Sequence, residues 1–296
     1  SCYFAGDFCT FVEDFSTPLS AQWFAGYDGS MSTDFVVESG RPEIIDGNLH
    51  LPLVDIGNST RGAATILSTT RFLMYGSFEV RLRTAPTSSV VSAFIGVSNL
   101  YDEIDLEWTP GARDGTQENV VQSNWYYRAE RIFDVNAREY SLSSNTFDNF
   151  HTYRVDWTPE TIQWRANGVV FNQVVRSELG DAEYRYPATP MRISFGVWQG
   201  GDSNLWSGPN MVNFTQVPPQ SNSVIIDYMK VIGRDCGGGD PDFDPQQSSA
   251  GFQDRPPVNG FTFDGVGTRA VDVRPISSGS ALAVGIATLS CLLFLL

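Results

Sequence analysis

Three carboxylic side chains alternate with apolar ones between Glu103 and Trp108, in the order Glu-Ile-Asp-Leu-Glu-Trp. Successive side chains of a β-strand point to opposite faces, so Glu103, Asp105 and Glu107 share one face of such a strand. Like charges at adjacent positions on one face destabilise a sheet, so a purely structural strand gains nothing from this pattern. The spacing therefore favours a chemical function for the three carboxyl groups.

The outer pair, Glu103 and Glu107, has the spacing that retaining cleavage of a glycosidic bond needs. Residues four apart on a strand have Cα atoms about 13 Å apart, and two inward-leaning Glu side chains bring their carboxyl groups to roughly 5 Å. One carboxylate then attacks the anomeric carbon while the other group protonates the leaving oxygen. Asp105 can hydrogen-bond the nucleophile, and its negative charge is expected to raise the proton affinity of the neighbouring acid.

Two other uses of an acidic triplet remain open. A solvated acidic face on an edge strand is disfavoured, because Ile104, Leu106 and Trp108 indicate a central, packed strand. A calcium site usually takes its ligands from a loop that also offers carbonyl oxygens. A zinc site rich in histidine is disfavoured by the presence of only two His residues. We therefore expect neither a metal nor a cofactor.

The surrounding sequence predicts strands to carry these residues. Apolar and polar residues alternate in 77–83 and in 152–157, and Asn167-Gly168 separates two further strand-like segments in the manner of a hairpin. Strands at short intervals with many turn residues predict an all-β fold, a β-jelly-roll sandwich of two antiparallel sheets. Sheets of this size must curve, so we expect a concave substrate cleft.

Composition excludes one class of partner. The chain has 296 residues, with 34 Asp and Glu against 19 Lys and Arg and a formal net charge of -15. Every phosphate contact would have to overcome repulsion, so we expect no nucleic-acid partner. Phe, Trp and Tyr make up 13% of the residues, enough for a core and for flat surfaces that stack on sugar rings.

The cysteines and two sequons indicate a secreted protein. Cys2 and Cys9 lie close together, as in a small disulfide loop, and residues 1–10 are expected to form that loop. Buried free thiols are the alternative, and the pairing of Cys236 stays open. Asn58 and Asn213 each begin an Asn-x-Thr pattern that predicts glycosylation.

The C-terminal quarter differs in composition from the rest. We expect a catalytic domain over residues 11–235 and a flexible linker over 236–276, where Gly, Asp, Pro, Gln and Ser predominate. Residues 277–296 begin with small side chains and end in an uncharged apolar run, the signal for a glycosylphosphatidylinositol anchor. A tail-anchored helix is the alternative, although the run is short for one. The anchor predicts an extracellular protein in the cell wall or on the outer face of the plasma membrane.

The sequence resembles glycoside hydrolase family 16. The segment Glu103-Ile104-Asp105-Leu106-Glu107 matches the family's E-x-D-x-E signature, in the version without a bulge residue before the second glutamate. Further landmarks follow in the family's order, at 13–16, 46–49, 75–81, 150–157 and 190–192. Within the family, 102–108, 122–124 and 198–202 most resemble the Crh-type fungal cell-wall transglycosylases, which join chitin to β-glucan and often carry a glycosylphosphatidylinositol anchor.

The resemblance implies a role for each matching residue. It makes Glu103 the nucleophile, Asp105 its auxiliary and Glu107 the general acid and base. It also implies that Gln122 and Asn124 hydrogen-bond sugar hydroxyls near the cleavage point.

Two aromatic residues are candidates for the cleft. The resemblance implies that Trp198 offers an apolar platform to a sugar ring, with a core tryptophan as the alternative. Strand alternation places Tyr126 on the same face as Gln122 and Asn124, which makes it a further candidate for substrate binding.

The predicted function is a retaining enzyme that cleaves a cell-wall β-glycan and transfers the glycosyl group to another glycan, crosslinking chitin to β-glucan. An endo-β-1,3(4)-glucanase on the same scaffold is the alternative. An anchored lectin-like wall-binding protein would need no paired glutamates, so the intact triplet argues against it. The expected partners are polysaccharides and, through the lipid anchor, a membrane, and the protein is expected to be a monomer.

Overall fold

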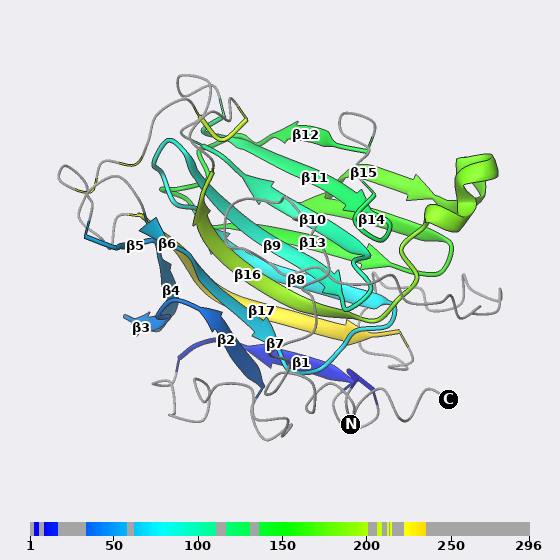
Figure 1. Ribbon diagram of the computed structural model, residues 1–296, viewed down its shortest axis with the longest axis horizontal. Coiled ribbons are helices and arrows are strands. Elements are labelled where there is room, and N and C mark those ends of the chain that lie inside the picture. The colour runs from blue at the N-terminus through cyan, green and yellow to red at the C-terminus, as the bar shows by residue number, and fades with distance from the viewer. Residues whose placement is uncertain are drawn as a thin grey trace, which may run out of the picture.

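The computed structural model describes residues 3–5, 9–16, 34–57, 62–110, 117–130, 136–200, 206–208, 212, 214 and 222–234. These residues form two large antiparallel sheets stacked face to face (Figure 1). Among the described residues, the one helical element in the order of elements is the 3₁₀ stretch η4 (Arg176–Arg185). It connects the two sheets.

The first sheet has seven strands, with the strand of the acidic triplet near its middle. Its order is β12 (Arg138–Ser141), β11 (Val120–Tyr126), β10 (Glu103–Trp108), β9 (Val90–Ser98), β16 (Met191–Gln199), β7 (Thr65–Thr69) and β2 (Phe35–Ser39). Strand β10 is hydrogen-bonded on both sides, to β9 and to β11. A solvated edge strand, the alternative interpretation of the triplet, is therefore wrong.

The second sheet has eight strands. Its order is β15 (Val169–Val175), β14 (Thr161–Ala166), β13 (His151–Trp157), β8 (Gly76–Arg83), β17 (Ser223–Gly233), β4 (Asn48–Pro52) and β3 (Glu43–Ile45), while β1 (Thr10–Glu13) also pairs with β17. Strands β5 (Val54–Asp55) and β6 (Gly62–Ala63) form a small separate ladder. The prediction of a sandwich of two antiparallel sheets is confirmed.

The main core lies between the sheets, and one face of β10 packs into it. Ile104, Leu106 and Trp108 are fully buried in it. Trp108 packs edge to face on Tyr153 of β13, with the ring centres 4.6 Å apart. From β14, Trp164 donates its indole N–H to the backbone carbonyl oxygen of Asp105, at 3.0 Å. The opposite sheet thus anchors both the apolar side chains and the backbone of the strand.

The predicted hairpin at Asn167-Gly168 is present. The two residues have φ values of 48° and 81°, the pair of positive φ angles that a tight turn between twisted strands requires, and they join β14 to β15. The side-chain amide of Asn167 also lies 2.9 Å from Nδ1 of His151, so this histidine has a structural contact at the turn.

Several sequence predictions concern residues outside the described ones, namely Cys2, Asn58, Asn213, Cys236 and the tail from 236 to 296. Cys9 is the one cysteine within the described ranges, and it is not a free thiol. Its predicted pairing with Cys2 stays a prediction. No helix among the residues that the structure describes has the length and apolar character needed to cross a bilayer.

Candidate active site

The three carboxyl groups project from the face of β10 that points away from the main core. This follows from strand alternation, because Ile104, Leu106 and Trp108 fill the opposite face. We call this outer side of the seven-stranded sheet the cleft face. The expectation that the triplet shares one face of a packed, central strand is thus met by the fold.

On one side of β10 the cleft face is polar. In the antiparallel register with β11, Glu103 lies opposite Tyr126, Asp105 opposite Asn124 and Glu107 opposite Gln122. Three of the four side chains expected to bind substrate therefore stand in a row beside the three expected to do chemistry. This row follows from the two-residue period of both strands and from the way they are paired.

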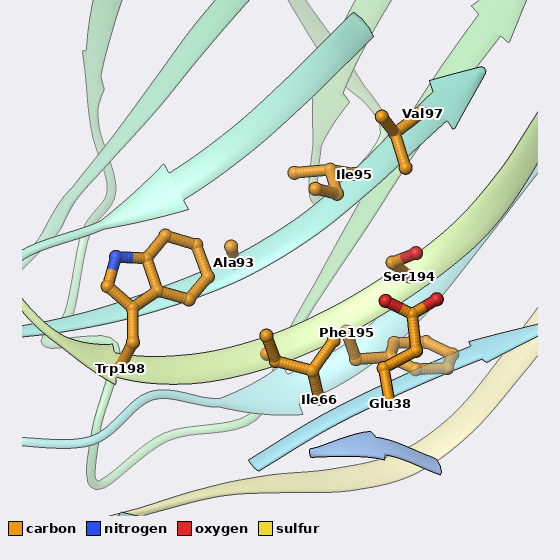
Figure 2. Close-up of a pocket in the computed structure, with 9 residues that line it drawn as sticks. Glu38, Ile66, Ala93, Ile95, Val97, Ser194, Phe195 and Trp198 are labelled. Atoms are coloured by element: carbon orange, nitrogen blue, oxygen red, sulfur yellow. The ribbon is translucent and has the colours of Figure 1, made fainter. Parts of the chain in front are cut away.

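On the other side of β10 the cleft face is apolar. In the register with β9, Glu103 lies opposite Val97, Asp105 opposite Ile95 and Glu107 opposite Ala93. These residues belong to a second apolar cluster, separate from the main core, whose buried members are Ala64, Ile66, Val91, Ala93, Ile95 and Trp198. Figure 2 shows the hollow that they line, with the Trp198 ring beside Ala93 and the Glu38 carboxylate at the other end.

The carboxyl groups of the triplet are poorly solvated and have no cationic partner within the described ranges. Asp105 is fully buried, Glu107 is 4% exposed and Glu103 is partly exposed. Neither carboxylate oxygen of Asp105, nor Oε1 of Glu107, receives a hydrogen bond from an N–H or hydroxyl group of the described residues. Within that part of the chain, no ion pair reaches any of the three.

Burial accordingly favours the protonated forms. It raises the pKa of Glu103 to about 7. It raises the pKa of Asp105 well above the ordinary value, and the charges of Glu103 and Glu107 add to that shift. Burial and then the charge of Glu103 raise the pKa of Glu107 well above its ordinary value. The site thus stores protons at a pH at which exposed carboxylates are ionised.

The contact between Glu103 and Asp105 divides the charge unequally. Their hydrogen bond lowers the pKa of Glu103 and raises that of Asp105, which favours the charge on Glu103 and the proton on Asp105. Asp105 then donates to an ionised Glu103, which fits the expected orienting role. The charge of Glu103 raises the pKa of Glu107, and the interaction between Asp105 and Glu107 raises the pKa of Asp105; the expected effect of the Asp105 charge on Glu107 stays a prediction.

Asp102, just before β10, is also buried, but its carboxylate accepts hydrogen bonds from several donors. Its Oδ1 accepts a hydrogen bond from the backbone N–H of Arg128, at 3.2 Å. Its Oδ2 accepts from the N–H of Ala188 and the hydroxyl of Thr189, at 2.9 and 2.6 Å. Three donors from two other loops therefore fix the point at which the triplet begins. The sequence pattern offers no signal for this role beyond an acidic residue next to the triplet.

The residues expected to bind substrate differ in how much surface they offer. Asn124 is partly exposed and donates its amide N–H to the Tyr126 hydroxyl, at 2.7 Å, while Tyr126 itself is largely buried. Trp198 lies on the cleft face but is only 1% exposed, so it forms a wall of the hollow and leaves little ring surface for a sugar. The alternative of a packed tryptophan describes it better.

Gln122 and a second tryptophan are joined at the cleft face. The Gln122 carbonyl oxygen accepts a hydrogen bond from the indole N–H of Trp206, at 2.6 Å. Trp206 is partly exposed and packs against the apolar cluster that contains Trp198. No periodic pattern surrounds Trp206 in the sequence, and 84 residues separate it from Gln122, so only the folded chain shows this contact.

Comparison with known proteins assigns the chain to a family. A family model for glycosyl hydrolases family 16 matches residues 31–216. The chain belongs to this family. The matched range contains β10 with the whole acidic triplet, as well as Gln122, Asn124, Trp198 and Trp206. The resemblance inferred from the sequence is confirmed.

The chain's curated relatives include a probable glycosidase and a Crh-like protein. The probable glycosidase CRR1 of Saccharomyces cerevisiae is 34% identical over 153 residues, which are 51% of this chain and 34% of that protein. The Crh-like protein UTR2 of Candida albicans is 34% identical over 185 residues, 62% of this chain and 37% of that protein. The aligned part thus spans about a third of the length of these curated relatives.

Solved structures of a transglycosylase and a β-glucanase share the architecture. The apo Crh5 transglycosylase superimposes with a TM-score of 0.62 at 22% identity, covering 77% of this chain and 85% of that one. A β-glucanase of Bacillus licheniformis superimposes with a TM-score of 0.59 at 18% identity, covering 75% and 97%. At such identities the likeness concerns the fold, and it confirms the jelly-roll prediction.

Proposed function

We propose that this family 16 protein is a retaining enzyme that cleaves a cell-wall β-glycan and transfers the glycosyl group to a second glycan. The observation that carries the proposal is the pair Glu103 and Glu107, four residues apart on one face of β10. They lie opposite Val97 and Ala93, which line the hollow, and have no cationic partner among the described residues. A protein that only binds glycans has no need for two carboxyl groups that retain protons.

In the first step the ionised Glu103 attacks the anomeric carbon of the donor. Glu107 gives its proton to the glycosidic oxygen, the bond between carbon and oxygen breaks, and an ester joins the sugar to Glu103. Asp105 keeps the attacking oxygen oriented through the hydrogen bond described above.

The second step uses the change in charge that the first one produces. Once Glu103 is esterified, it no longer carries the negative charge that raises the pKa of Glu107. Glu107 therefore holds a proton less tightly in the intermediate and can accept one from an incoming hydroxyl group. That oxygen attacks the anomeric carbon and releases Glu103, which regenerates both starting protonation states.

The identity of the incoming hydroxyl separates transfer from hydrolysis. Transfer from chitin to β-glucan is supported by the resemblance to Crh-type proteins and by relatives that bear the name Crh-like. One of the solved neighbours is described as a Crh5 transglycosylase in complex with NAG. An endo-β-1,3(4)-glucanase is the second candidate, favoured by neighbours described as a β-glucanase and a laminarinase.

Product analysis with a fluorescent chito- or laminari-oligosaccharide acceptor tests the proposal. Transfer attaches the label to a polymer, and Glu107→Gln should abolish this product. Shortened donor chains without labelled polymer would exclude the transferase and leave the glucanase.

The surroundings of the enzyme are part of the proposal. Residues 277–296 would direct attachment of a glycosylphosphatidylinositol anchor, so that the enzyme works outside the cell on polysaccharides, with a disulfide between Cys2 and Cys9 and glycans on Asn58 and Asn213. The composition of the tail supports the anchor, and Cys9, which is not a free thiol, is consistent with the disulfide. Phosphatidylinositol-specific phospholipase C should release the protein from the cell surface. Retention of 281–296 in the mature chain would contradict the anchor.

A further inference from the structure

We propose that Gln122 is a positioning residue that holds the Trp206 indole at the Glu107 end of the cleft, where the sugar that leaves or arrives stacks on the indole. The inference rests on the proposed function, because it takes Glu107 to be the acid and base. It replaces the expected role of Gln122, direct contact with sugar hydroxyls, by one that acts through a tryptophan.

The first observation is the location of the pair. Gln122 lies directly opposite Glu107 in the register of β11 with β10, and Ala93 lies opposite Glu107 on the other side. Trp206 donates to Gln122 and packs against the apolar cluster to which Ala93 belongs. The indole therefore belongs to the part of the cleft face next to Glu107.

The second observation is the orientation of the amide. Gln122 is only 9% exposed, and its Nε2 donates to the Thr109 hydroxyl at 3.2 Å while its Oε1 accepts from Trp206. An indole N–H can only donate, so it selects the carbonyl oxygen and leaves the amino group toward Thr109. The side chain is thus turned toward Trp206 and Thr109, and little of its surface is open to a ligand.

The third observation is that the backbone beside Trp206 is held independently of Gln122. The N–H of Ser89 donates to the carbonyl oxygen of Ser207, at 2.8 Å, and the Ser89 hydroxyl donates to that of Gly208, at 3.1 Å. Loss of the Gln122 amide should therefore release the indole ring while the attached backbone stays in place.

The chemistry of the reaction says which sugar meets the indole. Glu107 protonates the leaving oxygen and later deprotonates the incoming hydroxyl, so the ring that carries this oxygen lies beside Glu107. A partly exposed indole there offers a flat apolar surface to the C–H face of that ring. Trp206, rather than the buried Trp198, is then the aromatic platform of the site.

A double-mutant cycle with Gln122→Met and Trp206→Phe tests this. Gln122→Met keeps the length of the side chain but removes the acceptor, and Trp206→Phe keeps a ring but removes the N–H. Each single change should raise the KM for the oligosaccharide acceptor about five-fold, the effect of one net hydrogen bond, while kcat changes little. If Gln122 acts through the indole, the double variant should also show about five-fold, because both changes remove the same contact.

Two outcomes would overturn the inference. Multiplication of the two effects in the double variant would show that Gln122 contacts the sugar itself, and an unchanged KM in Gln122→Met would show that the contact has no role in binding. If the enzyme only hydrolyses, the KM of the oligosaccharide substrate replaces that of the acceptor, since its leaving sugar occupies the same place.

The controls separate binding from stability and from the proposed function. Gln163→Met removes an amide on the other sheet and should leave KM unchanged. The thermal midpoint of Gln122→Met should stay near that of the parent, whereas a merely structural residue would lower it without a selective change in KM. Activity that survives Glu107→Gln would refute the proposed function itself, independently of the cycle.

Discussion

Both outer faces of this sandwich carry buried carboxylates, but the two faces surround them with different partners. On the outer side of the eight-stranded sheet, which we call the polar face, Asp156 of β13 is 7% exposed and lies between two guanidinium groups. On the cleft face, Asp105 is more deeply buried and has no cationic partner among the described residues. The same type of side chain is neutralised on one face and left to hold a proton on the other.

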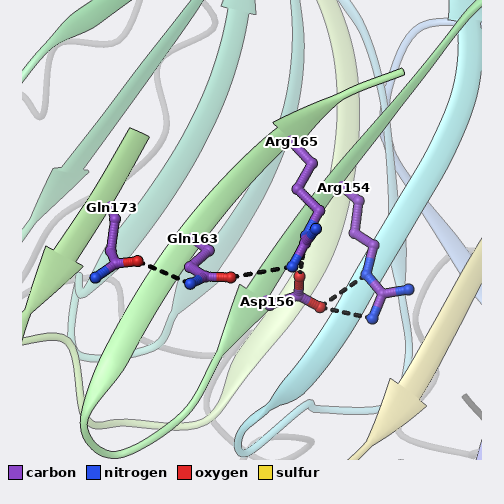
Figure 3. Close-up of polar contacts among 5 residues, drawn as sticks. All are labelled: Arg154, Asp156, Gln163, Arg165 and Gln173. Carbon is purple, nitrogen blue, oxygen red and sulfur yellow. Dashed lines mark hydrogen bonds and ion pairs between the residues drawn. The ribbon is translucent and has the colours of Figure 1, made fainter. Parts of the chain in front are cut away.

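The polar face shows what a structural carboxylate needs. Arg154 donates from Nε to one oxygen of Asp156, at 2.7 Å, and Arg165 donates from Nε to the other, at 2.8 Å. The contacts continue from Arg165 to Gln163 and from Gln163 to Gln173, across three strands (Figure 3). Opposite charges and hydrogen-bond donors compensate for the lost hydration of this carboxylate.

The cleft face lacks that compensation, which has a chemical consequence. Desolvation without a counter-ion among the described residues raises the pKa of the whole triplet, so these groups hold protons at a pH at which exposed carboxylates have lost them. The contrast between the two faces indicates that burial alone does not suit a carboxyl group to proton transfer. The difference comes from whether cations and hydrogen-bond donors lie next to the buried carboxylate.

The largest effect should come from removing the charge and the proton of the outer pair. Glu103→Gln and Glu107→Gln should each lower kcat by roughly a thousand-fold, because one loses the nucleophile and the other the proton donor. Calorimetric titration should still show oligosaccharide binding. Glu79→Gln, the same change on the polar face, is the matched control and should keep near-normal activity. Near-normal turnover in either cleft variant would refute the assignment.

A smaller loss of activity is expected from replacing Asp105, the buried aspartate of the cleft face. Asp105→Ala removes a hydrogen bond that lowers the pKa of Glu103, so that pKa should rise and the acidic limb of the kcat/KM profile should move to higher pH. We expect a loss of about 10- to 100-fold in kcat, the effect of one hydrogen bond to a charged group. Asp105→Asn retains a donor and should shift the limb less. Equal profiles for the two variants would contradict a donor role.

The free energy of unfolding should also depend on pH, because the pKa of Glu103 on the cleft face is raised. The pKa of Glu103 is raised from 4.5 to about 7 in the folded protein. Between these values the native state keeps a proton that the unfolded chain loses, so this contribution to stability is present below about pH 4.5 and is lost as the pH rises through 7. Urea unfolding at pH 5 and pH 7.5 should show a smaller decrease for Glu103→Gln than for the parent. Equal decreases would argue against the raised pKa.

The smallest effect is expected on the polar face. Arg165→Met removes one of the two cations beside Asp156 and should lower the free energy of unfolding by about 1 kcal/mol, a modest amount because the guanidinium is partly exposed. Arg154 remains to hold the carboxylate. Activity should be unchanged when rates are measured well below the unfolding transition, and a selective loss of kcat would show that the two faces are coupled.

Much of this protein follows from the sequence because the relevant rules are local. The two-residue period of a strand places Glu103, Asp105 and Glu107 on one face and Ile104, Leu106 and Trp108 on the other, whatever the strand pairs with. The same rule groups Gln122, Asn124 and Tyr126, and the Asn167-Gly168 pair specifies its turn through backbone angles that few residues adopt. These features depend on neighbours in the chain.

Other features were decided only by tertiary structure, because they depend on which distant residues meet. The pairing of β10 with β9 and β11 creates a polar and an apolar side of the cleft, and the packing of Trp198 buries a ring that the sequence leaves equally suited to a ligand. The contact of Gln122 with Trp206 turns a presumed sugar ligand toward an indole. Whether a carboxylate meets an arginine or only other carboxylates is likewise set across strands, and this supply of partners separates Asp156 from Asp105.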